Sequence, residues 1–212
     1  MREYDAILFD LDGVVCYTDE YHYRAWQAMA DSIGVYFDRE INNRLRGVSR
    51  MACMDIILER CKSELSQAEK EELAAQKNEL YKKLLVNMSP ADLPDEVKAT
   101  LEELRARGYL LAIGSSSKNA PFILRQIGLG EFFDAVSDGN NITRSKPDPE
   151  VFEKAAQMLC VAPERCLVVE DAVSGAEAAH RGGMKAACVG DASRAKAGDY
   201  NLSSVKDLLE IL

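Results

Sequence analysis

Ala6-Ile7-Leu8-Phe9-Asp10-Leu11-Asp12-Gly13 joins a short apolar run to two carboxylates and a glycine. Four apolar residues are too few for a helix, and Gly13 bounds the run, so residues 6–9 are predicted to form a buried parallel strand. Ligands of open α/β sheets bind beyond the carboxyl ends of the strands. Asp10 and Asp12 are two positions apart and share a face. We therefore expect both carboxylates to point into a ligand crevice.

Strands and helices alternate in the sequence after Pro90. The apolar runs predict strands at 109–114, 133–136, 166–169 and 185–189, and the helical patterns lie at 94–107, 119–127, 149–159, 173–181 and 203–212. Such alternation indicates βαβ units, which wind a parallel sheet in the right-handed sense. The predicted fold class is therefore α/β, with a Rossmann-like parallel sheet.

Residues 17–87 carry helical signals and no strand signal. Helices are predicted at 18–33, 38–45 and 51–61, and a longer one follows the capping-box pattern of Ser66 and Glu69 to about Leu85. An all-helical block after a single strand is typical of a separate inserted domain. We expect a discontinuous core domain of residues 1–16 and 88–212, and a helical cap domain of residues 17–87.

Composition narrows the class of protein. The 212 residues, 47% hydrophobic and 29% charged, suit one large domain or a core domain with an insertion. A formal net charge of −9 argues against a nucleic-acid partner, which needs a basic face. No apolar stretch approaches the ~18 residues of a membrane span, and no signal peptide is visible. Six cysteines without CxxC spacing indicate reduced thiols, so we expect a cytoplasmic protein, acting as a monomer.

Polar residues collect where the predicted strands end. They are Asp10 and Asp12, Ser115 and Ser116, Glu170 and Asp171, with Lys146 in the loop before residue 149. Converging carboxylates repel one another unless a cation lies among them, and oxygen ligands suit Mg²⁺. Lys146 and the hydroxyl groups can bind phosphoryl oxygens. The set indicates phosphoryl transfer, with one carboxylate as nucleophile and another as general acid/base.

Each of these pieces has a simpler structural explanation. Asp10 to Gly13 would serve as an Asx-rich turn, Glu170-Asp171 as an exposed acidic turn, and Ser115-Ser116-Ser117 as a helix cap. Lys146-Pro147 would serve as an ordinary loop. All four segments are predicted to lie at the same edge of the sheet, and this coincidence favours the functional interpretation.

Four motifs resemble those of the haloacid dehalogenase superfamily: Phe9-Asp10-Leu11-Asp12-Gly13-Val14, Ser115 after a strand, Ser145-Lys146-Pro147, and Glu170-Asp171. The helical block is similar to the cap of the β-phosphoglucomutase-like branch. Further stretches similar to that branch are Thr18, Glu20-Tyr21-His22, Gly47-Val48-Ser49-Arg50, Lys77-Asn78 and Ser117-Lys118-Asn119. The resemblance covers nearly the whole chain.

The resemblance implies roles for the core residues. Asp10 would be the nucleophile and phosphate carrier, and Asp12 the acid/base toward the sugar hydroxyl. Mg²⁺ would be held by the Asp10 carboxylate, the Asp12 backbone carbonyl, and the carboxylates of Glu170 and Asp171. The transferring phosphoryl group would be bound by Ser115, Ser116 and Lys146.

The resemblance also implies roles for the cap. Arg50 would hold the phosphate that is not transferred, and the remaining substrate-binding positions would be Arg46, Gly47, Val48, Ser49, Ser117 and Asn119. His22, Lys77 and Thr18 would help to position Asp12. Arg46 stands where this branch usually has lysine, which keeps the charge but changes its geometry.

The implied activity is that of a Mg²⁺-dependent mutase acting on a small phosphosugar. It would interconvert β-D-glucose 1-phosphate and glucose 6-phosphate through an aspartyl phosphate and glucose 1,6-bisphosphate. Arg46 and Tyr17, which stands where an acidic residue is often found, leave a sugar-phosphate phosphatase as the alternative. A non-enzymatic protein that reuses the fold is a third hypothesis, against which the intact set of acids and Lys146 argues.

Overall fold

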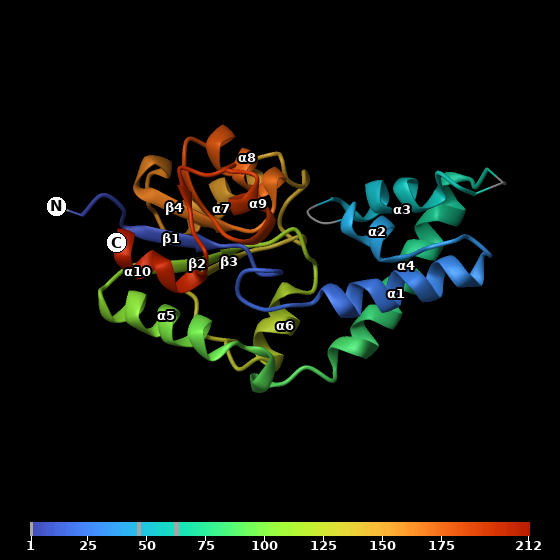
Figure 1. Ribbon diagram of the computed structural model, residues 1–212, viewed down its shortest axis with the longest axis horizontal. Helices are drawn as coiled ribbons and strands as arrows, with labels where there is room; N and C mark the ends of the chain where they lie inside the picture. The colour runs from blue at the N-terminus through green and yellow to red at the C-terminus, as the bar shows by residue number, and fades with distance from the viewer. Residues whose placement is uncertain (1, 46–47, 62–63) are drawn as a thin grey trace. The chain divides into compact units, whose positions relative to one another are not determined.

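The computed structural model describes residues 2–45, 48–61 and 64–212, and the chain divides into two compact units (Figure 1). The core unit comprises Met1–Tyr17 and Ser89–Leu212, and the helical unit comprises Thr18–Met88. Each junction lies one residue from the expected domain limit. The chain therefore leaves the core unit once and returns to it once.

The core unit is built on a parallel sheet. In the described part of the chain its six strands have the order β3-β2-β1-β4-β5-β6. The strands are β1 (Ala6–Phe9), β2 (Leu110–Gly114), β3 (Ala135–Ser137), β4 (Cys166–Glu170), β5 (Lys185–Cys188) and β6 (Tyr200–Asn201). This sheet confirms the predicted α/β class.

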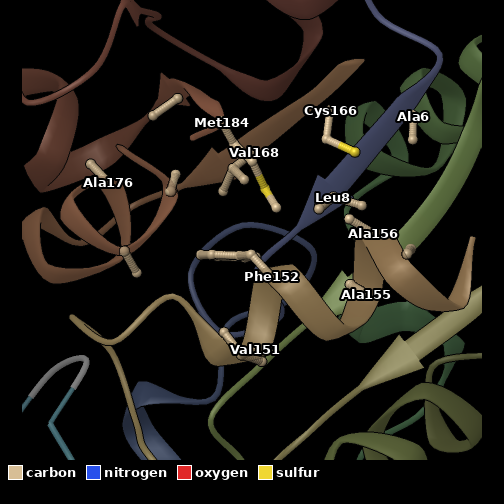
Figure 2. Packing of buried hydrophobic residues seen from close by; sticks show 14 of the residues in the cluster. Ala6, Leu8, Val151, Phe152, Ala155, Ala156, Cys166, Val168, Ala176 and Met184 are labelled. Atoms are coloured by element: carbon tan, nitrogen blue, oxygen red, sulfur yellow. The ribbon is translucent and has the colours of Figure 1, made fainter. Parts of the chain in front are cut away.

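Helices cover both faces of the sheet (Figure 1). They are α5 (Asp95–Ala106), α6 (Ala120–Gln126), α7 (Glu150–Met158), α8 (Val173–Arg181), α9 (Gly190–Arg194) and α10 (Leu208–Ile211), with 3-10 turns η1 (Pro90–Asp92), η2 (Pro163–Arg165) and η3 (Val205–Asp207). Figure 1 shows α7 and α8 on one face and α5 and α6 on the other. Ala6 and Leu8 of β1 join the buried cluster under α7 and α8 (Figure 2).

Strand β1 is apolar throughout because both of its faces are covered. Phe9, its last residue, pairs with Ile113 of β2 and Val169 of β4. The residues that follow these three positions therefore lie side by side at one edge of the sheet.

Several element ends are shifted by one to three residues from the prediction, and two elements differ in a way that the structure explains. Phe133 and Asp134 precede β3 instead of belonging to it, because the Asp134 carboxylate accepts a hydrogen bond from the Leu111 amide at 2.8 Å. The C-terminal segment begins as the turn η3 after Ser204 and becomes helical only in α10. Helix α9 and strand β6 were not predicted, because elements of five and two residues are too short to show a period.

The helical unit contains α1 (Asp19–Ser32), α2 (Arg39–Asn43), α3 (Arg50–Leu58) and α4 (Gln67–Leu85). Its buried cluster includes Trp26 and Met29 of α1 and Met54 and Ile57 of α3. The predicted capping box at the start of α4 is present. Within residues 2–45, 48–61 and 64–212, no helix has the length and apolar character that crossing a membrane requires.

Candidate active site

Four of the polar residues predicted at the strand ends lie close together at the carboxyl edge of the sheet, namely Asp10, Lys146, Glu170 and Asp171. Asp10 follows β1, and its amide donates to the Val169 carbonyl at 2.9 Å. Ser115 follows β2, and its amide donates to the Ser137 carbonyl at 3.0 Å. The prediction placed Glu170 directly after the strand 166–169. In the structure Glu170 is the last residue of β4, because β4 continues its pairing with β5 to this residue.

Lys146 joins two of the acids through its ammonium group. Its Nζ donates to Oδ1 of Asp10 and, at 2.5 Å, to Oε1 of Glu170. The Lys146 side chain is 3% exposed and that of Glu170 is 1% exposed. A buried charge without a partner is strongly destabilising, so these three groups depend on one another.

Asp171 completes the acidic cluster. One carboxylate oxygen from each of Asp10, Glu170 and Asp171 lies within 4.8 Å of the other two. The second oxygen of Glu170 accepts from the Ala172 amide at 2.9 Å, which fixes its orientation. Gly13 has φ +93°, and a Cβ there would lie 2.3 Å from Oδ2 of Asp171. Glycine therefore lets the chain pass close beside this carboxylate.

The cluster carries more negative than positive charge. Burial raises the pKa of Asp10 well above its ordinary value, and the nearby charges of Glu170, Asp12 and Asp171 raise it further, although Lys146 opposes them. Burial alone would lower the pKa of Lys146, but its two carboxylate partners outweigh it and raise that pKa. Lys146 is therefore a fixed cation, and Asp10 is a carboxylate that needs more positive charge to stay ionised.

A hard divalent cation such as Mg²⁺ fits this donor set. The candidate ligands are all oxygens, which such ions prefer, and they lie close together. A bound divalent cation would also reverse the rise in the pKa of Asp10. The Asp12 carboxylate is not one of the three clustered groups, in line with the expectation that this residue offers its backbone carbonyl, which stays a prediction.

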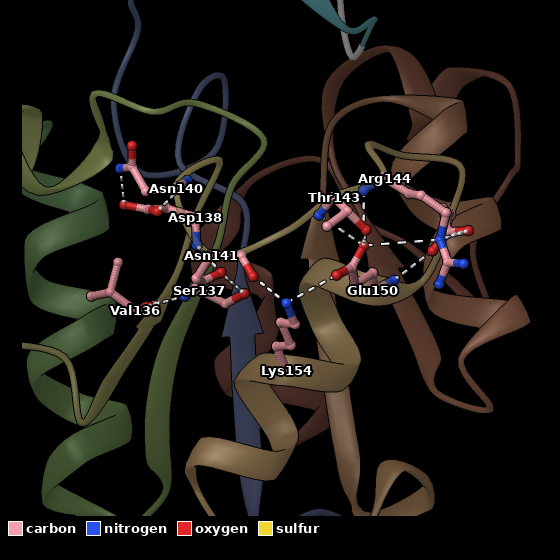
Figure 3. A network of polar contacts seen from close by, with 10 residues as sticks. Val136, Ser137, Asp138, Asn140, Asn141, Thr143, Arg144, Glu150 and Lys154 are labelled. Carbon is pink, nitrogen blue, oxygen red and sulfur yellow. Dashed lines mark hydrogen bonds and ion pairs between the residues drawn. The ribbon is translucent and has the colours of Figure 1, made fainter.

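The loop that carries Lys146 is anchored by Glu150, the first residue of α7 (Figure 3). Its carboxylate accepts from the Thr143 amide at 3.0 Å, the Thr143 hydroxyl at 2.9 Å and the Arg144 amide at 2.8 Å. It also pairs with Lys154 at 2.9 Å. Sequence reasoning missed Glu150, although an acid in the first turn of the predicted helix 149–159 was a visible signal.

The three serines after β2 form a compact turn. Oγ of Ser115 accepts from the Ser117 amide at 3.1 Å, and Oγ of Ser117 accepts from the Asn119 amide at 3.2 Å. Among the described residues, the buried hydroxyl of Ser116 has no hydrogen-bond partner. A buried polar group in this state costs free energy, so Ser116 stands out as a residue with a role other than folding.

In the helical unit, partly buried His22 lies in hydrogen-bonding contact with buried Lys77. Nδ1 of His22 lies 3.0 Å from Nζ of Lys77. The Lys77 ammonium also lies 4.6 Å from the ring centroid of Trp26 and 4.5 Å from that of Tyr81. Burial, with Lys77 and Arg50 nearby, lowers the pKa of His22 well below its ordinary value. His22 is therefore neutral and accepts the hydrogen bond from Lys77 at Nδ1.

Arg50 is the first residue of α3 and follows the N-cap Ser49, whose hydroxyl accepts from the Ala52 amide at 3.3 Å. Its Nη2 donates to Oδ1 of Asn78 on α4 at 2.8 Å. This bond directs the guanidinium group of Arg50, and sequence reasoning had given Asn78 no role. Burial lowers the pKa of Arg50 from its ordinary value, but the side chain remains a cation.

The remaining predicted site residues are placed as follows. Thr18 is buried before α1, and its carbonyl accepts from the His22 amide at 3.0 Å. The Val48 amide donates to the Leu45 carbonyl at 3.3 Å. Arg46 and Gly47 lie outside the described residues.

Comparison with known proteins shows which family the chain belongs to. The family model of haloacid dehalogenase-like hydrolases matches residues 4–183. The β-phosphoglucomutase of Bacillus subtilis strain 168 is 38% identical over 210 residues, which cover 98% of this chain and 93% of that protein. The fructose-1-phosphate phosphatase YqaB of Escherichia coli K12 is 31% identical, over 87% of this chain and 96% of that protein.

A solved structure extends the comparison to three dimensions. The crystal structure of β-phosphoglucomutase from Clostridium difficile superposes with a TM-score of 0.90 at 33% identity, covering 97% of this chain and 93% of that one. The fold is therefore shared along nearly the full length. The chain is an enzyme of the haloacid dehalogenase superfamily and belongs to the family of haloacid dehalogenase-like hydrolases.

Proposed function

We propose that this enzyme is a Mg²⁺-dependent phosphosugar mutase that interconverts β-D-glucose 1-phosphate and glucose 6-phosphate. The observation that carries the proposal is the similarity to the Bacillus subtilis β-phosphoglucomutase, which extends over 98% of the chain and so includes the helical unit. The buried group of Asp10, Lys146 and Glu170 supports the phosphoryl-transfer chemistry.

In the first half of the reaction Asp10 carries the phosphoryl group. Asp12 takes the proton from the 6-hydroxyl of β-D-glucose 1-phosphate, and the freed oxygen attacks phosphorus. The bond between phosphorus and the Asp10 oxygen breaks, which gives glucose 1,6-bisphosphate and the Asp10 carboxylate.

In the second half the bisphosphate binds with its ends exchanged. The Asp10 carboxylate attacks the phosphorus on O1, the bond between that phosphorus and O1 breaks, and Asp12 returns its proton to O1. Glucose 6-phosphate leaves and the aspartyl phosphate is restored. Lys146, Ser115 and Ser116 bind the phosphoryl oxygens throughout. Asp10, Asp12, Glu170 and Asp171 would hold Mg²⁺, which would supply positive charge to balance that of the transferring group.

A mutase needs a second phosphate-binding group, because each intermediate carries one phosphate that does not react. We assign this role to Arg50, whose planar guanidinium suits phosphate. The hydrogen bond to Asn78 supports it by reducing the orientations open to Arg50. We further propose that His22, Lys77 and Thr18 help to position Asp12.

A sugar-phosphate phosphatase is the second candidate. The 31% identity to a fructose-1-phosphate phosphatase favours it, since the same nucleophile serves both reactions. The two differ in whether water or a sugar hydroxyl accepts the phosphoryl group from Asp10.

A product assay separates the two candidates. The enzyme is incubated with β-D-glucose 1-phosphate, Mg²⁺ and a trace of the 1,6-bisphosphate, and glucose 6-phosphate and inorganic phosphate are followed together. The mutase gives glucose 6-phosphate without phosphate release. Phosphate release at every turnover, with no isomer formed, would establish the phosphatase instead.

A further inference from the structure

The phenyl ring of Phe152 faces the Lys146 ammonium. Nζ of Lys146 lies 4.7 Å from the ring centroid, within the range of a cation–π contact. Phe152 is completely buried and extends from α7 into the cluster shown in Figure 2. The ammonium therefore has two kinds of partner, the carboxylates of Asp10 and Glu170 and the face of an aromatic ring.

Gly114, at the end of β2, gives this ring its space. A Cβ at position 114 would lie 2.5 Å from Cδ1 and 2.6 Å from Cε1 of Phe152. The backbone of Gly114 is not in the left-handed region, so its conformation does not call for glycine. The position of the Phe152 ring is what requires glycine, because any side chain at position 114 would displace the ring.

We propose that Phe152 is a positioning residue for phosphoryl transfer, which holds the Lys146 ammonium in place through its aromatic face. The inference rests on the proposed function. A lysine head group sits on a flexible four-carbon stem and needs fixed partners to stay in one place. In the proposed cycle Asp10 loses its free carboxylate whenever it carries the phosphoryl group. The ring of Phe152 is a partner that remains unchanged in both halves of the reaction.

A fluorinated series tests the role of the ring electrons. Phe152 of the full chain is replaced, at this position alone, by 4-fluoro-, 3,4-difluoro- and 3,4,5-trifluorophenylalanine. Fluorine withdraws electron density from the ring face while keeping a similar shape, so it weakens the attraction for a cation. We expect kcat for Mg²⁺-dependent hydrolysis of acetyl phosphate to fall stepwise, by about tenfold for the trifluoro ring, with KM changed less than twofold. A kcat that stays flat along the series would overturn the inference.

Val151→Ala is the matched control for packing. Val151 is the neighbouring residue of α7, is equally buried, and belongs to the same cluster. This variant should lower Tm and leave kcat within twofold of the unsubstituted enzyme. A loss of kcat as large as that of the trifluoro ring would assign the effect to packing and reject the positioning role.

A second measurement does not depend on activity. The trifluoro substitution is combined with Lys146→Met, and the free energy of unfolding is measured for the four proteins of the cycle. We expect fluorination to destabilise the protein with Lys146 and to have less effect in the Met background. Equal effects in both backgrounds would overturn the inference. Failure of the mutase proposal is seen separately, as the absence of glucose 6-phosphate with the unsubstituted enzyme.

Discussion

Gly175 leaves open the space that the carboxylate of Glu170 occupies: a Cβ at position 175 would lie 1.9 Å from Oε1 of Glu170. That oxygen is the one that accepts from Lys146. Glu170 ends β4 and Gly175 lies in α8, so this close approach joins the acidic cluster to the helix that follows it. A methyl group at 175 would push Glu170 away from both Lys146 and the candidate metal ligands.

Gly175→Ala should therefore weaken metal binding. We expect the Mg²⁺ concentration that gives half-maximal activity to rise by about 10–100-fold, the usual effect of disturbing the support of a ligand. A Mg²⁺ titration of acetyl phosphate hydrolysis measures it. Gly130→Ala is the matched control, because the atom nearest to its Cβ would be Cγ of Arg125, on a flexible side chain, at 3.1 Å. An unchanged Mg²⁺ dependence in Gly175→Ala would mean that Glu170 is not a ligand.

Lys146→Ala should lower kcat by about 10²–10³-fold, the usual cost of removing one group that stabilises developing charge. The buried Asp10 and Glu170 also lose their shared cation, so Tm should fall as well. Steady-state kinetics with acetyl phosphate and a thermal melt test both effects. Lys98→Ala, at an exposed position of α5, should change neither. Activity within tenfold of the parent would remove Lys146 from the proposed mechanism.

Arg50→Ala should raise KM for β-D-glucose 1-phosphate by at least about tenfold, because a charged hydrogen-bond donor to phosphate is lost. Hydrolysis of acetyl phosphate, which has no second phosphate, should stay within twofold. The comparison of the two substrates is the measurement. Arg60→Ala, an exposed arginine of the same unit, serves as the control. Equal losses on both substrates would refute the assignment of Arg50.

Glu150 should make stability depend on pH in the acid range. Hydrogen bonds from Lys154 and from the Thr143 and Arg144 segment lower the pKa of Glu150 from 4.5 to about 2. A carboxyl whose pKa is lowered by folding stabilises the protein above its unfolded pKa and loses that contribution as pH falls. The free energy of unfolding should therefore drop more steeply between pH 4.5 and 2 in the parent than in Glu150→Gln. Parallel curves from denaturant titrations would contradict this expectation.

His22 should remain neutral at pH values where an exposed histidine takes up a proton. Folding lowers its pKa well below 6.5, so the folded state resists protonation and the protein loses stability as pH falls below that value. The chain has two histidines, and His180→Gln identifies the NMR signal of His22 by elimination. We expect that signal to keep the neutral shift at pH 6. Titration near 6.5 would show that the pairing of His22 with Lys77 is wrong.

The sequence was most informative where an apolar run ends in an acid. Asp10 and Glu170 were predictable because each lies at the end of such a run, and parallel strands bring their carboxyl ends together. The roles of Phe152 and Gly175 were not predictable, because both residues lie inside predicted helices and look like ordinary helix residues there. Their roles depend on how α7 and α8 pack on the sheet, and periodicity carries no information on contacts of that kind.

Asn78 illustrates a second limit. It lies 28 positions from Arg50, and nothing in the spacing links the two residues. Their hydrogen bond arises from the packing of α3 against α4, so only the three-dimensional structure identifies Asn78 as a support for Arg50. Short elements such as β6 are missed by prediction for a different reason, since two residues are too few to show a periodic pattern.

The central place of β1 also sets the order in which the chain can fold during synthesis. Ala6–Phe9 are synthesised long before one of their two partner strands, which begins at Cys166. The described members of the buried cluster in the helical unit lie within residues 23–74, so they are synthesised long before β4. One edge of β1 therefore stays without its partner until β4 has been synthesised, a state that invites pairing with other chains. The brevity of that strand, four residues followed at once by Asp10, limits this exposure.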